Sequence, residues 1–253
     1  MTRIVHSKAA ATSRLSFKHL AAVAVLTSCA SFAPTAMAEV IDFNKTDNQF
    51  MGHEDFFLSD GGNFWLSAYS NVVGAQPGDL VGGVFDGSDP QGCGIACPNN
   101  NATNYYGVLN DGILQIDPVK AGGTVSIRGF DASFLGYAQG ASYPAVSGLL
   151  RIQGFYADNT SMYETYQLAG PVGGSFQFQH YDTTSNFAAQ QFSSVAFFGF
   201  SCNTAGSCSA FSTNKGQFAL DNVVAAVPEP STYAMLLLGL AGLGFAARRR
   251  KPA

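Results

Sequence analysis

Short segments in which every second side chain is apolar recur through the middle of this chain. Residues 40–43 and 63–69 are two examples. A period of two places the apolar side chains on one face of a β-strand, so these segments predict strands with one buried and one exposed face. Because antiparallel sheets usually bury only one face, the pattern favours an antiparallel sheet protein over a helical one.

Further strands are expected along the same part of the chain. Asp111-Gly112 lies between 105–109 and 113–116 and predicts a hairpin turn, since these residue types tolerate positive φ. Turns rich in Gly and Asn separate the remaining predicted strands, which are 124–134, 148–156, 162–168, 175–181, 195–201 and 217–224. About ten short strands without a helix predict an all-β, antiparallel β-sandwich of jelly-roll type, with a closed barrel as the alternative.

The part of the chain between the two ends carries strong negative charge. Of 17 acidic residues, 16 lie between positions 39 and 227, whereas only five of the 13 basic residues do. The resulting net charge of −11 repels phosphate backbones, so we expect no nucleic-acid binding. The 189 residues of this segment are enough for one domain with a sizeable core.

The first 38 residues have the features of a secretory signal peptide. Four basic residues precede an apolar stretch over 20–33, and Ala36 and Ala38 form an A-x-A cleavage site. We therefore expect export through the Sec translocon and cleavage by signal peptidase after Ala38, which leaves 39–227 as the folded domain. An uncleaved membrane anchor and a lipoprotein signal with lipid on Cys29 are the alternatives.

The last 26 residues contain three features in order. The tripeptide Pro228, Glu229, Pro230 comes first, an apolar segment over 233–247 follows, and the basic residues at the end are Arg248, Arg249, Arg250 and Lys251. A helix over 231–247 would measure about 25 Å, slightly less than a hydrocarbon core, and its basic end can snorkel to the interface. The positive-inside rule predicts one transmembrane helix with a cytoplasmic C-terminus and the domain outside.

This C-terminal arrangement resembles the PEP-CTERM sorting signal of Gram-negative bacteria, which is recognised by an exosortase, a membrane transpeptidase-like cysteine protease. The resemblance implies a protein held transiently in the inner membrane with its domain in the periplasm. Exosortase would then remove the span and pass the protein to the cell surface or the exopolysaccharide matrix. Residues 217–223 also look like the QFxxD segment of a PEP-CTERM subgroup whose domains lack an assigned activity.

Four cysteines remain once the signal peptide is removed, and an even number in an exported protein predicts disulfides. Three pairings are possible, and the local one, Cys93 with Cys97 and Cys202 with Cys208, is the simplest. Each bridge closes a short loop, so we expect at most about 2–3 kcal/mol of stability from each. A four-cysteine zinc site is the alternative, although the C-x3-C and C-x5-C spacings depart from the usual C-x2-C.

The sequence contains no catalytic motif. It lacks G-x-S-x-G, H-E-x-x-H and P-loop patterns, and its two mature histidines have no nucleophile motif beside them. We interpret His53-Glu54-Asp55 as a polar loop and His180 as the polar end of a core strand. No catalytic residue, no enzyme activity and no required cofactor are therefore predicted, and a glycan-active enzyme using two of the 16 acids is the alternative.

Calcium is the one metal that the residue types favour. Strand parity puts Phe218 and Leu220 on one face of the last strand and Asp221 on the other. Where the first and last strands of a jelly roll meet, Asp221 can join Asp42 and Asp60 as hard oxygen ligands for Ca²⁺.

Sugar recognition uses an aromatic ring surrounded by hydrogen-bonding groups. Trp65 is the single tryptophan and the candidate ring. The candidate hydrogen-bonding side chains are Gln153, Gln167, Gln177, Gln179, Tyr105, Tyr106, Tyr156 and Tyr163.

Together these features predict a non-catalytic protein of the cell surface or extracellular matrix that binds exopolysaccharide. A secreted glycan-active enzyme and a structural, self-associating surface protein are the alternatives. The three classes need different structures: a binder needs an exposed aromatic strip on one sheet, an enzyme needs a cleft with paired acids, and a self-associating protein needs a long unpaired edge.

Overall fold

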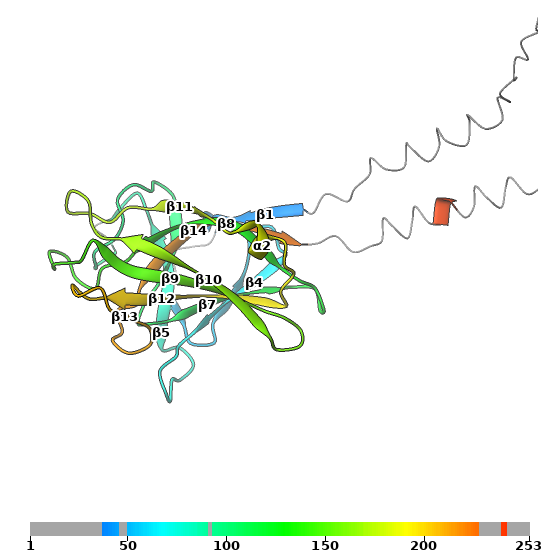
Figure 1. The fold of residues 1–253 in the computed structure, drawn as a ribbon, viewed down its shortest axis with the longest axis horizontal. Helices are drawn as coiled ribbons and strands as arrows, with labels where there is room; N and C mark the ends of the chain where they lie inside the picture. Colours follow the sequence, from blue (N-terminus) through cyan, green and yellow to red (C-terminus); the bar gives the residue numbers. More distant parts are fainter. Residues whose placement is uncertain (1–36, 46–49, 91–92, 228–238, 242–253) are drawn as a thin grey trace, which may run out of the picture. The chain divides into compact units, whose positions relative to one another are not determined.

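The computed structural model describes residues 37–45, 50–90, 93–227 and 239–241. The described residues between 37 and 227 belong to one compact unit. Its described residues contain fourteen β-strands in two antiparallel sheets, which we call sheet A and sheet B (Figure 1). The predicted all-β, antiparallel sandwich is therefore confirmed.

Sheet A has the strand order β11-β8-β14-β6-β5-β2, and β1 also pairs with β14. The first and last strands of the domain therefore meet, as the calcium prediction assumed. The bounds of the sheet A strands are β1 (Met37–Ile41), β2 (Phe50–Gly52), β5 (Leu80–Asp86), β6 (Asn104–Val108), β8 (Ser126–Phe134), β11 (Gln179–Asp182) and β14 (Phe218–Val227).

Sheet B has the order β10-β9-β12-β7-β4-β3, and β13 pairs with β12. Several of these strands lie side by side in Figure 1. Their bounds are β3 (Phe56–Leu58), β4 (Phe64–Tyr69), β7 (Ile113–Pro118), β9 (Val146–Phe155), β10 (Ser161–Ala169), β12 (Ser194–Cys202) and β13 (Cys208–Ser209). A single helical turn, α2 (Ser185–Ala188), precedes β12 and is capped by the Thr184 side chain.

The two sheets pack face to face around a core of aromatic and aliphatic side chains. On β14, Phe218 and Leu220 belong to this core, while Asp221 lies on the opposite face of sheet A, as strand parity predicted. Burying each large apolar side chain stabilises the fold by about 1.5–3 kcal/mol. The face of each strand that carries the apolar side chains is therefore the face that packs into the core.

A second, smaller hydrophobic cluster lies on the outer face of sheet A. Its buried members are Cys97, Tyr105, Leu135 and Ala219. The long connection from β5 to β6, residues 87–103, contributes Cys97 to this cluster and so packs across the outer face of the sheet. This packing brings polar side chains of the connection close to β14.

The predicted hairpin at Asp111-Gly112 is wrong. β6 pairs with β5 and β14, whereas β7 pairs with β4 and β12, so this turn carries the chain from sheet A to sheet B. Asn110 and Asp111 do have positive φ, 56° and 54°. The Asp111 carboxylate is buried and accepts backbone N–H groups of Thr213, Asn214 and Gly216, which fastens the turn to the loop before β14.

The predicted strand over 175–181 also differs from the structure, because β11 begins only at Gln179. Phe176 packs in the main core, whereas Phe178 packs against the second cluster, so the two do not share one strand face. Within β11, Tyr181 stacks on the core residue Phe130, and His180 therefore lies on the outer face of sheet A. The three short strands β2, β3 and β13 and the seven-residue strand β5 were not predicted.

No helix among the described residues is long and apolar enough to cross a membrane. Residues 1–36 of the predicted signal peptide, which include its cleavage residue Ala36, lie outside the described residues, as do the Pro228–Pro230 tripeptide and the basic end. The other cleavage residue, Ala38, is described and lies on β1 opposite Ala226, so β1 begins two residues before the predicted start of the domain at Glu39. Of the predicted span, only residues 239–241 are described, and they are helical.

Candidate functional site

The outer face of sheet B is an open surface, which we call the open face, and Trp65 lies on it. One row of side chains crosses all six strands of the main path in register. In order across the sheet the row consists of Tyr163, Gln153, Ala196, Gln115, Ser67 and Phe56. Five gaps of about 4.8 Å make the row about 24 Å long.

Strand alternation explains why this row faces outward. The neighbours of its members along the chain, such as Leu66, Leu114 and Phe197, belong to the buried core. Adjacent residues of a strand point to opposite faces, so Ser67, Gln115 and the other row members turn away from the core.

Aromatic side chains occupy both ends of the row. At one end Phe56, 63% exposed, meets Trp65, 36% exposed, edge to face with ring centroids 5.4 Å apart. At the other end Tyr163 is 57% exposed, and the guanidinium of Arg151 lies 4.3 Å from its ring centroid. The middle of the row has smaller side chains than its ends and is less exposed: Ala196 and Ser67 are buried, at 6% and 8% exposed, beside the half-buried Gln153 and Gln115.

Hydrogen bonds orient the two glutamines of the row. Gln115 donates its Nε2 to both carboxylate oxygens of Asp117, at 2.9 and 3.0 Å, and Gln153 donates to Ser161 Oγ at 3.1 Å. Burial raises the pKa of Asp117, which lies opposite Trp65 in the register. Fixed amides between aromatic rings are the chemistry that recognises a polyhydroxylated ring, since the ring faces stack and the amides bond hydroxyls.

A second polar feature, which we call the polar pocket, lies on the outer face of sheet A. It is a cavity of about 250 Å³ lined by Asn100, Asn101, Asp131, Phe178, Gln179, His180, Asp221 and Asn222. Asp131 on β8 is the register partner of both His180 on β11 and Asp221 on β14, so these side chains form a line across three strands.

Every carboxylate oxygen in the polar pocket has a hydrogen-bond partner. His180 Nδ1 lies 2.7 Å from Asp131 Oδ1, and Asn222 Nδ2 donates to Asp131 Oδ2 at 2.8 Å. Asp221 accepts Asn101 Nδ2 and the Asn222 backbone N–H, both at 2.7 Å. The register of β14 shifts after Asp221, and Asn222 has a φ of 49°, so a bulge turns its amide toward Asp131.

The pocket perturbs two titratable groups. Burial raises the pKa of Asp221 to about 6, against the lowering effect of its hydrogen bonds, and the charges of Asp131 and Asp42 add to the rise. The hydrogen bond to Asp131 raises the pKa of His180. Sequence reasoning missed Asp131 and Asn101, because only the pairing of distant strands and the packing of residues 87–103 bring them to Asp221.

The three predicted calcium ligands are only partly brought together. Asp42 and Asp60 share a side-chain hydrogen bond. Burial and this bond raise the pKa of Asp60. Burial also acts to raise the pKa of Asp42, but hydrogen bonds from Asn44 outweigh it and hold that pKa below its ordinary value. Asp221 is instead held by Asn101 and Asn222. Among the described residues no group of three or more His, Cys, Asp or Glu side chains is placed to hold a metal ion, and calcium binding stays a prediction.

The structure places both predicted disulfides. Cys93 is bonded to Cys97, and Cys202 to Cys208, which are register partners at the ends of β12 and β13. The first bridge closes a small loop in the connection that carries Asn100 and Asn101. The local pairing is thus the one formed, and these sulfurs do not form the alternative zinc site.

The candidate amides and tyrosines divide into four groups. Gln153 and Tyr163 lie in the row of the open face, and Gln179 lines the polar pocket. Tyr105 and Tyr106 are fully buried, so the prediction that they bind sugar is wrong: their rings fill the two hydrophobic clusters. The others lie outside the row: Gln167 is exposed on the same face of β10 as Tyr163, Gln177 lies in a loop and Tyr156 packs against the core.

His53 has the role expected of a residue in a polar loop. It follows β2, and its Nδ1 accepts the backbone N–H of Ser70 at 3.0 Å. The Asp55 carboxylate accepts the N–H of Gly52 at 2.6 Å. These side chains therefore fix the loop between β2 and β3.

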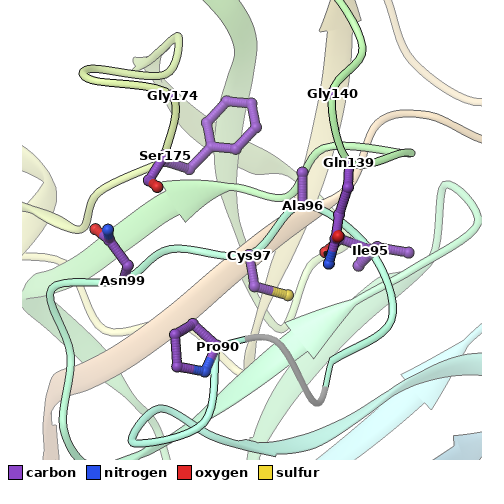
Figure 2. Close-up of a pocket in the computed structure, with 10 residues that line it drawn as sticks. Pro90, Ile95, Ala96, Cys97, Asn99, Gln139, Gly140, Gly174 and Ser175 are labelled. Atoms are coloured by element: carbon purple, nitrogen blue, oxygen red, sulfur yellow. Dashed lines mark hydrogen bonds between the residues drawn. The ribbon is translucent and has the colours of Figure 1, made fainter.

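Figure 2 shows a third hollow, a cavity of about 360 Å³ beside the Cys93–Cys97 loop. Pro90, Ile95 and Cys97 of the β5–β6 connection line it, and Gln139 and Ser175 line it from other loops (Figure 2). None of its described lining residues is charged. Nothing in this lining selects a particular ligand.

The fold and the C-terminal sorting motif define an exported β-sandwich protein. Residues 226–251 match the PEP-CTERM protein-sorting motif. The chain is thus an exported surface protein of the PEP-CTERM type, and this motif implies processing by an exosortase and passage through the secretion machinery. The assignment to the QFxxD subgroup stays a prediction.

The fold is similar to that of two solved DUF4465 family proteins. The one from Bacteroides caccae has a TM-score of 0.50 at 13% identity, covering 76% of this chain and 100% of that chain. The one from Bacteroides ovatus has a TM-score of 0.42 at 12% identity, covering 76% and 99%. At 13% identity the likeness to the Bacteroides caccae protein shows the fold alone. No curated protein sequence matches the chain.

Proposed function

We propose that this surface protein is a non-catalytic module that binds polysaccharide of the extracellular matrix through the open face. The observation that carries the proposal is the row of side chains from Tyr163 to Phe56, with aromatic rings at both ends and oriented glutamines between them. A row about 24 Å long suits an extended chain of several sugar units better than a single small molecule.

The polar pocket supports a binder over an enzyme. A glycosidase needs one carboxyl group to protonate the leaving oxygen and a second to act as base or nucleophile. Asp221 has the raised pKa of such an acid, but it exposes only 1% of its surface. Both of its oxygens and both of those of Asp131 are occupied by protein donors: Asp221 holds Asn101 of the β5–β6 connection, and Asp131 holds His180 of β11 and Asn222 of β14. These bonds support a structural role for both carboxylates.

The sheet edges give less support to self-association. β2 and β3 have only three residues each. β10 is a longer edge, but the Tyr181 hydroxyl donates to the Gln167 backbone oxygen at 2.8 Å and covers part of it. Short or covered edges are the usual protection against pairing with another chain.

Substitution of the aromatic ends tests the proposal. Binding of the purified protein to matrix polysaccharide and to a panel of neutral glycans is measured by isothermal titration calorimetry. Loss of one stacking ring removes about 0.5–1.5 kcal/mol, so Trp65→Ala should weaken binding about two- to tenfold, and Phe56→Ala together with Trp65→Ala should weaken it further.

The matched control is Phe50→Ala, which removes an exposed ring on β2 of sheet A, away from the row. It should leave binding unchanged. Equal affinity of the wild-type protein and the double variant would refute binding through the open face. Glycan turnover that disappears on Asp131→Asn would show instead that the protein is an enzyme.

A further inference from the structure

A fourth cavity, about 390 Å³ in volume, lies among loops that follow β8 and β12, and we call it the Lys215 pocket. Nine of its fourteen lining residues carry a hydroxyl group, and Lys215 is the charged one among these described residues. The pocket thus differs from the polar pocket, where two carboxylates face the cavity, and from the domain as a whole, which has a net charge of −11.

The ammonium group of Lys215 is placed over an aromatic ring. Its Nζ lies 4.1 Å from the ring centroid of Tyr137, which is 41% exposed and packs against Tyr143 at 5.2 Å. The ion pairs among the described residues are all formed by His53 or His180. Within that part of the chain, Lys215 therefore has no carboxylate partner in an ion pair. The nearby acid Asp111 instead binds three backbone N–H groups on both sides of Lys215.

The walls of the Lys215 pocket are held by covalent and hydrogen bonds. The Cys202–Cys208 disulfide joins the strands of one wall, and Ser201 Oγ lies 3.0 Å from Thr213 Oγ1. On the other wall the Tyr143 hydroxyl donates to the backbone oxygen of Ala138 and accepts its N–H, at 2.6 and 3.0 Å. A site held in this way binds a ligand with little loss of conformational entropy.

We propose that the Lys215 pocket binds a carboxylated sugar unit, such as a uronic acid residue of an acidic polysaccharide. The ammonium group pairs with the sugar carboxylate and the hydroxyl-rich lining bonds the sugar hydroxyls, while the Tyr137 ring holds the ammonium group in place by the cation–π contact. Since the net charge of the domain repels acidic polymers, a local cation without a carboxylate partner is what makes such binding feasible without a bridging metal ion. This site is separate from the open face and does not depend on binding there.

A matched pair of ligands tests the proposal. Hexagalacturonate and its carboxyl-reduced galactose counterpart are titrated into the purified protein in the presence of EDTA. The uronate should bind, at least tenfold more tightly than the reduced oligomer, and its affinity should fall as salt is raised. Lys215→Gln should remove this preference, whereas Lys120→Gln, at an exposed turn between β7 and β8, should leave it unchanged.

Further variants distinguish binding in the Lys215 pocket from binding elsewhere on the domain. Tyr137→Phe should retain binding and Tyr137→Ala should weaken it, while Trp65→Ala should have no effect on the uronate. No binding of hexagalacturonate, equal binding of the reduced oligomer, binding that requires calcium, or insensitivity to Lys215→Gln would each overturn the proposal. Loss on Trp65→Ala would place the uronate on the open face instead, so the two proposals fail separately.

Discussion

Because the pKa of Asp221 is raised, we expect Asp221→Asn to lower the free energy of unfolding at low pH and to increase it at high pH. Its pKa rises from 3.8 to about 6 on folding, so between these values the native state binds the proton more readily than the unfolded chain. Native stability therefore falls as pH rises through this window. One pKa unit corresponds to 1.36 kcal/mol, so the ionised carboxylate costs the folded state about 3 kcal/mol above pH 6.

Asp221→Asn removes the free-energy cost of burying an ionised carboxylate, and it also removes one hydrogen bond. The new amide oxygen can still accept the Asn222 N–H, but its NH₂ group faces the donor Nδ2 of Asn101. The lost bond costs about 1 kcal/mol at every pH. The variant should therefore be about 1 kcal/mol less stable than the wild type near pH 4 and about 2 kcal/mol more stable near pH 8.

Urea unfolding between pH 4 and pH 8, with the disulfides oxidised, measures this difference through the fluorescence of Trp65 and far-ultraviolet circular dichroism. His180 titrates in both proteins and so largely cancels. Asp158→Asn is the control: hydrogen bonds from Thr160 lower the pKa of Asp158 below 3.8, so the stability that this carboxylate contributes is already fully present above the unfolded pKa. The difference in stability between that variant and wild type should therefore stay constant from about pH 5 to pH 8. A free-energy difference between Asp221→Asn and wild type that stays constant across this range would refute the assigned burial and charge of Asp221.

The remaining predictions concern processing and covalent structure. Mass spectrometry of the surface form should find an N-terminus at Glu39 and no residues beyond the Pro228–Pro230 region. Intact Arg248–Lys251 peptides on protein released by exosortase-containing cells would contradict sorting. A lipid on Cys29 would establish the lipoprotein alternative. Cys202→Ser with Cys208→Ser should lower the free energy of unfolding by at most about 2–3 kcal/mol, because the closed loop is short. A much larger loss in chemical denaturation would show that the bridge holds the strands of sheet B together.

Local patterns in the sequence were enough to predict features that depend only on neighbouring residues. The direction of a side chain from a strand is set by its immediate backbone, so alternation correctly separated Phe218 and Leu220 from Asp221. The sorting motif is linear and was recognisable for the same reason. The positive φ at Asp111 also followed from local residue preference.

Strand pairing, in contrast, was decided only by the tertiary structure. The turn at Asp111 leads into the other sheet because its carboxylate is bound by the backbone of residues 213–216, about a hundred positions away. Asp131 and Asn101 reach Asp221 only when β8, β14 and residues 87–103 assemble. The exposure of Trp65 likewise depends on sheet B keeping its outer face uncovered. Contacts between distant segments have no local signature, because they form only once the chain folds back on itself and buries its apolar faces together.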